Sequence, residues 1–140
     1  MIFTDAEISY LARQQFGRLA TVQPDGTVQV NPVGFTHNRA LGTIDISGYR
    51  MAGSQKFRNV AVRDRVAFVI DDIISREPWQ VRCLEVRGTA EQVRPAAGAQ
   101  PAAGTDGALI RIRPRRVISF GLDDADRQSP LPALSARDVG

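Results

Sequence analysis

The sequence predicts a mainly β fold, a small β-barrel of about six or seven antiparallel strands with two short helices. Three observations lead to this prediction. Runs rich in apolar and β-branched residues recur along the chain and are separated by turn residues such as Pro24-Asp25-Gly26. Only two segments repeat their apolar residues at helical spacing. The connections between most strands are short, which favours antiparallel neighbours in a sheet that closes on itself.

The first third of the chain predicts one helix and three strands. Thr4 and Glu7 have the spacing of a capping box, so a helix is expected from Thr4 to Gln15, ended by Gly17. The runs GRLATVQ and TVQVNPVGF follow and are expected to form a hairpin. The run GTIDIS predicts a third strand, which stops at Gly48.

The second predicted helix lies between Ala52 and Arg63. Phe57 and Val60 are three residues apart with polar neighbours, and Ser54 is a suitable N-cap. DRVAFVIDD then predicts a buried strand, and CLEVRGTAEQV a longer, half-exposed strand.

Further along, glycine and proline interrupt the strand pattern. Gly88 predicts a bulge or bend in the long strand. The segment Pro95 to Gly107 is low in complexity and is not expected to pack, whereas ALIRIRP and RRVISFG supply the last strand material.

One domain is expected over residues 1–122, followed by a polar tail over residues 123–140 that is mobile unless a partner holds it. Apolar residues of the strands would fill the barrel, and no large internal cavity would remain. The residues expected inside are Leu19, Val30, Ile44, Val66, Phe68, Leu84 and Val86.

Composition excludes several kinds of site. Cys83 is the only cysteine and His37 the only histidine, so no disulfide framework and no metal site are expected. No leader and no apolar run of about 20 residues occurs, which favours a cytoplasmic protein without a membrane partner. The formal net charge is +3 and the aromatic content 6%, so no nucleic-acid partner is expected.

The only lysine, Lys56, lies in the first turn of the second predicted helix. A helix start offers free N–H groups and a partial positive charge, and anions bind there. Ser54, Gln55 and Lys56 add a hydroxyl, an amide and an ammonium group, and Arg50 or Arg58 would supply a second charge. The sequence therefore predicts a phosphate site, and the alternative is a helix cap with solvated neighbours.

The order of these parts is similar to a known family. VQVNPVGF, TIDIS, GYRMAGSQKFRNV, DRVAFVIDD and PWQVRCLEVRGTAE follow one another as in the pyridoxamine 5′-phosphate oxidase-like split-barrel family of flavin and deazaflavin proteins. The resemblance covers Thr4 to Leu122. The pattern closes with RRVISFGL and most resembles the branch that uses the deazaflavin coenzyme F420, including reductases of tetracycline-type antibiotic biosynthesis.

The resemblance implies an FMN-binding-type split β-barrel that forms a homodimer, with the cofactor between the subunits. It implies cofactor contacts at two strand ends, at the second helix and near the groove between subunits. These positions are Val30, Asn31, Pro32, Val33, Ser47, Gly48, Arg50, Ser54, Gln55, Lys56, Arg82 and Cys83. Trp79 and Arg87 would lie near the same groove, and Gln55 stands where relatives often have an arginine.

The resemblance also implies an oxidoreductase. Reduced F420 would deliver a hydride to an electron-poor small molecule such as an activated C=C bond, and solvent would supply the proton. No catalytic residue is assigned. Two alternatives remain open: an FMN-dependent oxidase or reductase, and a non-enzymatic protein that binds a flavin, a tetrapyrrole or a fatty acid. The RIRPRR run would suit the acidic tail of F420, or merely solvate a strand end.

Overall fold

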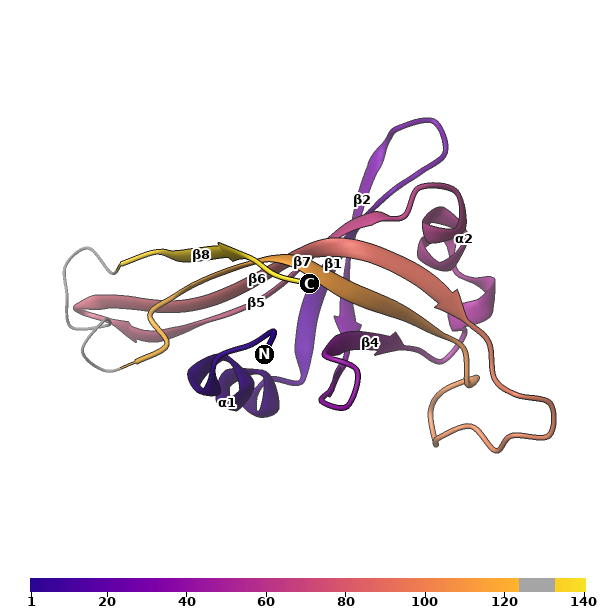
Figure 1. Ribbon diagram of the computed structural model, residues 1–140, viewed down its shortest axis with the longest axis horizontal. Helices are drawn as coiled ribbons and strands as arrows, with labels where there is room; N and C mark the ends of the chain where they lie inside the picture. Colours follow the sequence, from indigo (N-terminus) through magenta and orange to yellow (C-terminus); the bar gives the residue numbers. More distant parts are fainter. Residues whose placement is uncertain (124–132) are drawn as a thin grey trace.

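The computed structural model describes residues 1–123 and 133–140 (Figure 1). Two α-helices, a short 3-10 helix and eight strands form in this part of the chain. In order they are α1 (Asp5–Arg13), β1 (Phe16–Val22), β2 (Val28–Gly34), β3 (Thr36–Asn38), β4 (Thr43–Ser47), η1 (Met51–Gly53), α2 (Gln55–Val62), β5 (Arg65–Arg76), β6 (Trp79–Val93), β7 (Leu109–Phe120) and β8 (Ser135–Asp138).

All strands belong to one antiparallel sheet in the order β2-β1-β5-β6-β7-β4-β3, with β8 paired to β7. The long strands β5, β6 and β7 form its curved centre, and the β1–β2 hairpin rises from it near α2 (Figure 1). The curvature brings β2 into contact with β4. The predicted mainly β, split-barrel architecture with two helices is confirmed.

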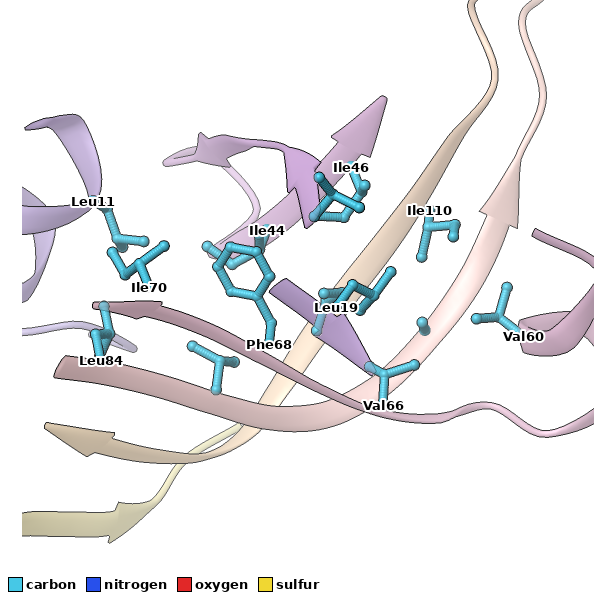
Figure 2. Close-up of a cluster of buried hydrophobic side chains, with 14 of the residues drawn as sticks. Leu11, Leu19, Ile44, Ile46, Val60, Val66, Phe68, Ile70, Leu84 and Ile110 are labelled. Atoms are coloured by element: carbon cyan, nitrogen blue, oxygen red, sulfur yellow. The ribbon is translucent and has the colours of Figure 1, made fainter. Parts of the chain in front are cut away.

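Apolar side chains from both halves of the sheet meet inside this curvature (Figure 2). Leu19, Ile44 and Phe68 lie together there and are almost completely buried. The burial expected from the sequence is confirmed for six residues: Leu19, Ile44, Val66, Phe68, Leu84 and Val86.

The prediction is wrong for Val30, whose side chain is 65% exposed. In β2 the side chains of Gln29, Asn31 and Val33 are less exposed than those of their neighbours, so Val30 points to the outer face. The apolar run VQVNPV does not reveal which of its two faces is covered.

Both helices begin as the sequence predicts. At α1, the Thr4 hydroxyl accepts a hydrogen bond from the N–H of Glu7 at 3.2 Å, and the Thr4 N–H donates to the Glu7 carboxylate at 2.9 Å. At α2, the Ser54 hydroxyl accepts from the N–H of Phe57 at 3.3 Å. Among the described residues, no helix is both long and apolar enough to cross a membrane.

Two glycines have steric roles. Gly17 does not end α1; it lies within β1, where a Cβ atom would collide with the ring of Phe68. Gly88 lies at a register shift between β6 and β7, and a Cβ atom there would collide with the carbonyl oxygen of Arg113. The bulge predicted at Gly88 is therefore confirmed.

The last residues of the tail are ordered, although the sequence predicts a tail that is mobile unless a partner holds it. Residues 124–132 lie outside the described part, but Ser135–Asp138 forms β8 on the edge of β7. The Arg137 guanidinium donates to the buried Glu7 carboxylate of α1 at 2.6 and 3.0 Å and to the Ile2 carbonyl at 2.7 Å. The polar composition gave no sign of this long-range pairing.

The Pro95 to Gly107 segment is exposed over most of its length, but its end is fastened. The Asp106 carboxylate accepts hydrogen bonds from the N–H of Ala52 at 2.9 Å and of Ala108 at 3.2 Å. The Asp106 N–H donates to the Gly48 carbonyl at 3.2 Å. The expectation that this segment does not pack is wrong at Asp106, which links it to η1.

Candidate functional site

The start of α2 holds most of the predicted phosphate-binding side chains. The Ser54 hydroxyl donates to the Met51 carbonyl at 2.7 Å while it caps the helix. The Arg58 guanidinium donates to the Gly53 carbonyl and to the Gln55 side chain, at 2.8 and 2.9 Å. These contacts fix the first turn of α2, so the helix start has a defined shape before any ligand arrives.

Lys56 differs from these neighbours. Its side chain is half-buried, and it has no hydrogen bond or ion pair with the residues that the structure describes. Arg50, which precedes η1, is exposed and likewise makes no side-chain contact of this kind within the described ranges. Two positive charges near one helix start are thus left for an anion.

A polar network connects this helix start to β2. The Gln55 amide donates to the Asn59 side chain at 2.8 Å. The Asn59 amide, completely buried, donates to the Thr21 hydroxyl at 3.0 Å and to the Gln29 side chain at 3.3 Å. Gln29 in turn donates to Asn31 at 2.7 Å. Gln55 and Asn31 therefore belong to one connected set.

β2 is the terminal strand of the sheet order, and its two faces differ. Val30 and Pro32 point outward and are exposed, whereas Asn31 and Val33 point inward. Pro32 pairs with Arg18 of β1, and the missing proline N–H is tolerated because the strand lies at a sheet edge. The structure therefore places the four predicted ring contacts on one strand but on two faces.

The end of β4 lies beside the helix start. Ser47 is exposed and pairs with Leu109 of β7, and the Gly48 carbonyl accepts the hydrogen bond from Asp106. Because Asp106 also accepts a hydrogen bond from Ala52, it joins the end of β4, η1 and the end of the Pro95 to Gly107 segment. Ser47, Gly48, Arg50 and the start of α2 are thus brought together.

Arg82 and Cys83 are separated from each other by strand alternation. Arg82 faces α1, where its guanidinium pairs with Asp72 at 2.6 and 2.9 Å and lies over the Tyr10 ring at 4.7 Å. The Tyr10 hydroxyl donates to Asp72 at 2.8 Å, and burial together with this bond raises the pKa of Tyr10. The structure does not bring Arg82 to the start of α2.

Cys83 lies on the opposite face of β6, directly across from Asp71. Burial, with the nearby carboxylates of Asp71 and Glu85, raises the pKa of the Cys83 thiol to about 11. Because the thiolate is the nucleophile, Cys83 remains a weak nucleophile at neutral pH.

At pH 7.5 we expect iodoacetamide to alkylate Cys83 about a hundredfold more slowly than a free cysteine, because so little thiolate is present. The rate, followed by mass spectrometry, should keep rising with pH to about 11. Asp71→Asn should speed the reaction by removing one carboxylate. A rate that levels off near pH 8 would contradict the raised pKa.

The arginines of the RIRPRR run do not act as one basic patch. Arg111 pairs with Asp45 at 3.1 Å, Arg113 with Glu91 at 2.9 Å, and Arg116 with Asp138 at 2.7 Å. Arg115 is the one member of the run without an ion pair to a described residue. The basic run is thus largely neutralised by its own neighbours.

Sequence reasoning missed two residues that shape the site, Asn59 and Asp106. Asn59 interrupts the apolar spacing of α2 with a polar group that is nevertheless buried, a signal that was available but ambiguous. Asp106 follows a low-complexity segment and gave no signal, because its partner Ala52 is 54 residues away.

The sequence matches the family model described as pyridoxamine 5′-phosphate oxidase over residues 3–121. The chain belongs to this family. The match spans strands β1 to β7, both helices and the candidate site, and the described split barrel agrees with it.

Relatives of this family member include a 5a,11a-dehydrotetracycline/5a,11a-dehydrooxytetracycline reductase of Streptomyces rimosus. It is 46% identical over 123 residues, which cover 88% of this chain and 86% of the relative. A match at this level, within this family, identifies the chain as an oxidoreductase.

Two solved structures are similar to this chain. A structure named F420 Reductase has a TM-score of 0.57 and 30% identity, and the match covers 76% of this chain and 90% of that one. A conserved hypothetical protein from Mycobacterium tuberculosis has a TM-score of 0.68 at 22% identity, covering 99% and 92%, and shows the fold alone.

Proposed function

We propose that the protein is a coenzyme F420-dependent reductase that transfers a hydride from the reduced deazaflavin to an electron-poor small molecule, such as one with an activated C=C bond. The observation that carries this proposal is the half-buried Lys56 beside the free N–H groups of α2. Support comes from the two relatives whose names are a dehydrotetracycline reductase and an F420 reductase.

The residues present suit such a cofactor. A phosphate would bind Lys56 and the first-turn N–H groups, with Arg50 as the second charge and Ser54 and Gln55 as further contacts. The side chains of Ser54 and Gln55 are already held in place by hydrogen bonds to Met51 and Asn59, respectively. Where relatives often have an arginine, this chain thus has a neutral amide that is hydrogen-bonded to Asn59 and Arg58.

The same network would orient the ring system. Asn59 connects Gln55 to Gln29 on β2, so the phosphate contacts and the strand proposed to flank the ring are held in a fixed relation. The edge position of β2 leaves a strand flank for a flat ring. Rigid placement of both ends of a cofactor lowers the ordering cost of the reacting geometry.

When bound, the cofactor supplies the hydride, and the chain contributes binding, orientation and exclusion of water. Asp106 lies near the helix start, but both of its carboxylate oxygens accept backbone N–H groups. The role of Asp106 is therefore to hold the end of the Pro95 to Gly107 segment in place. We assign the proton of the reaction to solvent.

We also propose that the protein works as a homodimer with the cofactor between subunits. The outer face of the β1–β2 hairpin supports this, because Phe16, Val28 and Val30 are each at least 65% exposed there. An exposed apolar group of this kind is typical of an interaction surface. Cys83 and Arg87 lie on the same outer side of the sheet.

A fluorescence titration of the purified apo protein with F420 and, separately, with FMN tests the cofactor. We expect F420 to bind at least tenfold more tightly, and stopped-flow oxidation of reduced F420 to require an added enone acceptor. Tighter FMN binding would instead favour a flavin-dependent oxidase or reductase. Tight binding without turnover of any acceptor would favour a carrier role.

A further inference from the structure

A surface cavity of about 570 Å³ lies on the outer side of the sheet, beside the start of β5. Arg65 at the start of β5, Arg87 in β6 and Arg115 in β7 line it, and no acidic residue of the described part does. The rest of the lining is Val66, Ala67, Gly88 and Thr89. We call this cavity the arginine groove.

The positive charge of the arginine groove is not balanced locally. Arg87 pairs with Glu85 at 2.7 Å, while Arg65 and Arg115 have no ion pair with any residue in the described ranges. The groove thus contains three guanidinium groups, and only one of them is paired with a carboxylate, which lies outside the cavity lining. By contrast, the neighbouring Arg113 is paired with Glu91 and does not line the groove.

The β-bulge accounts for the presence of Arg115. The register between β6 and β7 shifts at Arg87 and Gly88, so Arg115 has no direct partner in β6. A bulge re-aims the side chain of the extra residue. Gly88 is needed for this approach, since a Cβ atom would meet the Arg113 carbonyl oxygen. The β-bulge therefore brings Arg115 into the lining of the groove as its third arginine.

We infer that the arginine groove binds a small molecule with two or more closely spaced carboxylate or phosphate groups. Guanidinium groups match both oxyanions through paired N–H donors, and several of them suit a multivalent anion. The outward-facing Ala67 supplies an apolar floor for the uncharged part of the ligand, and the volume fits a small molecule.

This site is distinct from the proposed phosphate site. Arg65 follows the end of α2, whereas Lys56 lies at its start. The inference stands whether or not the protein is an F420 reductase, because it rests on the arginines, their lack of partners and the bulge.

Isothermal titration of the apo protein at about 0.15 M salt, with pyrophosphate and with tri-L-glutamate, tests the inference. We expect at least one of the two to bind, and Arg65→Gln or Arg87→Gln to weaken that binding about tenfold. Binding of tri-L-glutamate alone identifies a carboxylate ligand, and of pyrophosphate alone a phosphate ligand.

Two matched variants locate the site. Arg113→Gln removes the same charge from the paired neighbour and should change the affinity less than twofold. Lys56→Ala should leave this binding intact. The inference is overturned if neither anion binds, if Arg113→Gln weakens binding as much as Arg65→Gln, or if Lys56→Ala alone abolishes it. It is also overturned if the variants only change the oligomeric state on gel filtration.

Discussion

Glu7→Ala should lower the free energy of unfolding by about 3–5 kcal/mol, the usual cost of removing one partner of a buried ion pair. The Glu7 side chain is 1% exposed. Its carboxylate accepts from Arg137, from the Ser119 hydroxyl at 2.9 Å and from the Thr4 N–H. The substitution leaves these donors without an acceptor and removes the contact between α1 and β8.

Urea denaturation followed by circular dichroism measures this effect. Glu91→Ala is the matched control, since Glu91 pairs with Arg113 where both side chains are about half exposed. That pair should contribute at most about 1 kcal/mol. If both variants lose the same free energy of unfolding, the buried Glu7 pair stabilises the protein no more than the exposed Glu91 pair does.

The same pair gives the stability a pH dependence. Burial alone would raise the pKa of Glu7, but the hydrogen bonds from Arg137, Thr4 and Ser119 outweigh it and hold the pKa below its usual value. The contribution of Glu7 is therefore complete above the unfolded pKa of about 4.3 and is lost as pH falls through the lower folded pKa. The stability difference between wild type and Glu7→Ala should shrink in that acidic range.

Lys56→Ala should weaken cofactor binding tenfold to a hundredfold, or by about 1.5–3 kcal/mol, through loss of one charge-assisted phosphate contact. Lys56 has no bond to the described residues, so the substitution should leave the fold intact. The fluorescence titration with F420 gives the affinity, and thermal unfolding checks the fold.

Arg63→Ala is the control for this variant. Arg63 carries the same charge at the other end of α2 and donates to the Pro24 carbonyl at 2.9 and 3.2 Å. It should change the affinity less than twofold. If Lys56→Ala binds F420 as tightly as the wild type does, Lys56 is a solvated surface residue and the phosphate site lies elsewhere.

Local sequence signals predicted the local structure well. The capping residues Thr4 and Ser54 set the starts of both helices, and Gly88 marked the bulge, because these effects depend on a few neighbouring residues. The start of α2 was predictable for the same reason. The phosphate role of Lys56 itself remains a prediction until the titration is made.

Long-range contacts were not predictable. Val30 was expected inside because its run is apolar, and only the pairing of β2 with β1 shows that it faces outward. Arg82 lies over the ring of Tyr10, which belongs to α1 and is far away in the sequence. The partners of Asp106 and Arg137 are 54 and 130 residues away, beyond any local pattern.

The contact between Arg137 and α1 also affects the order in which the protein folds during its synthesis. The ribosome releases Glu7 early, but its guanidinium partner emerges 130 residues later. Until then, docking of α1 would bury a carboxylate without its cation, which is unfavourable. We therefore expect a nascent chain stalled before Arg137 to leave α1 undocked, so that α1 docks only after Arg137 has been synthesised.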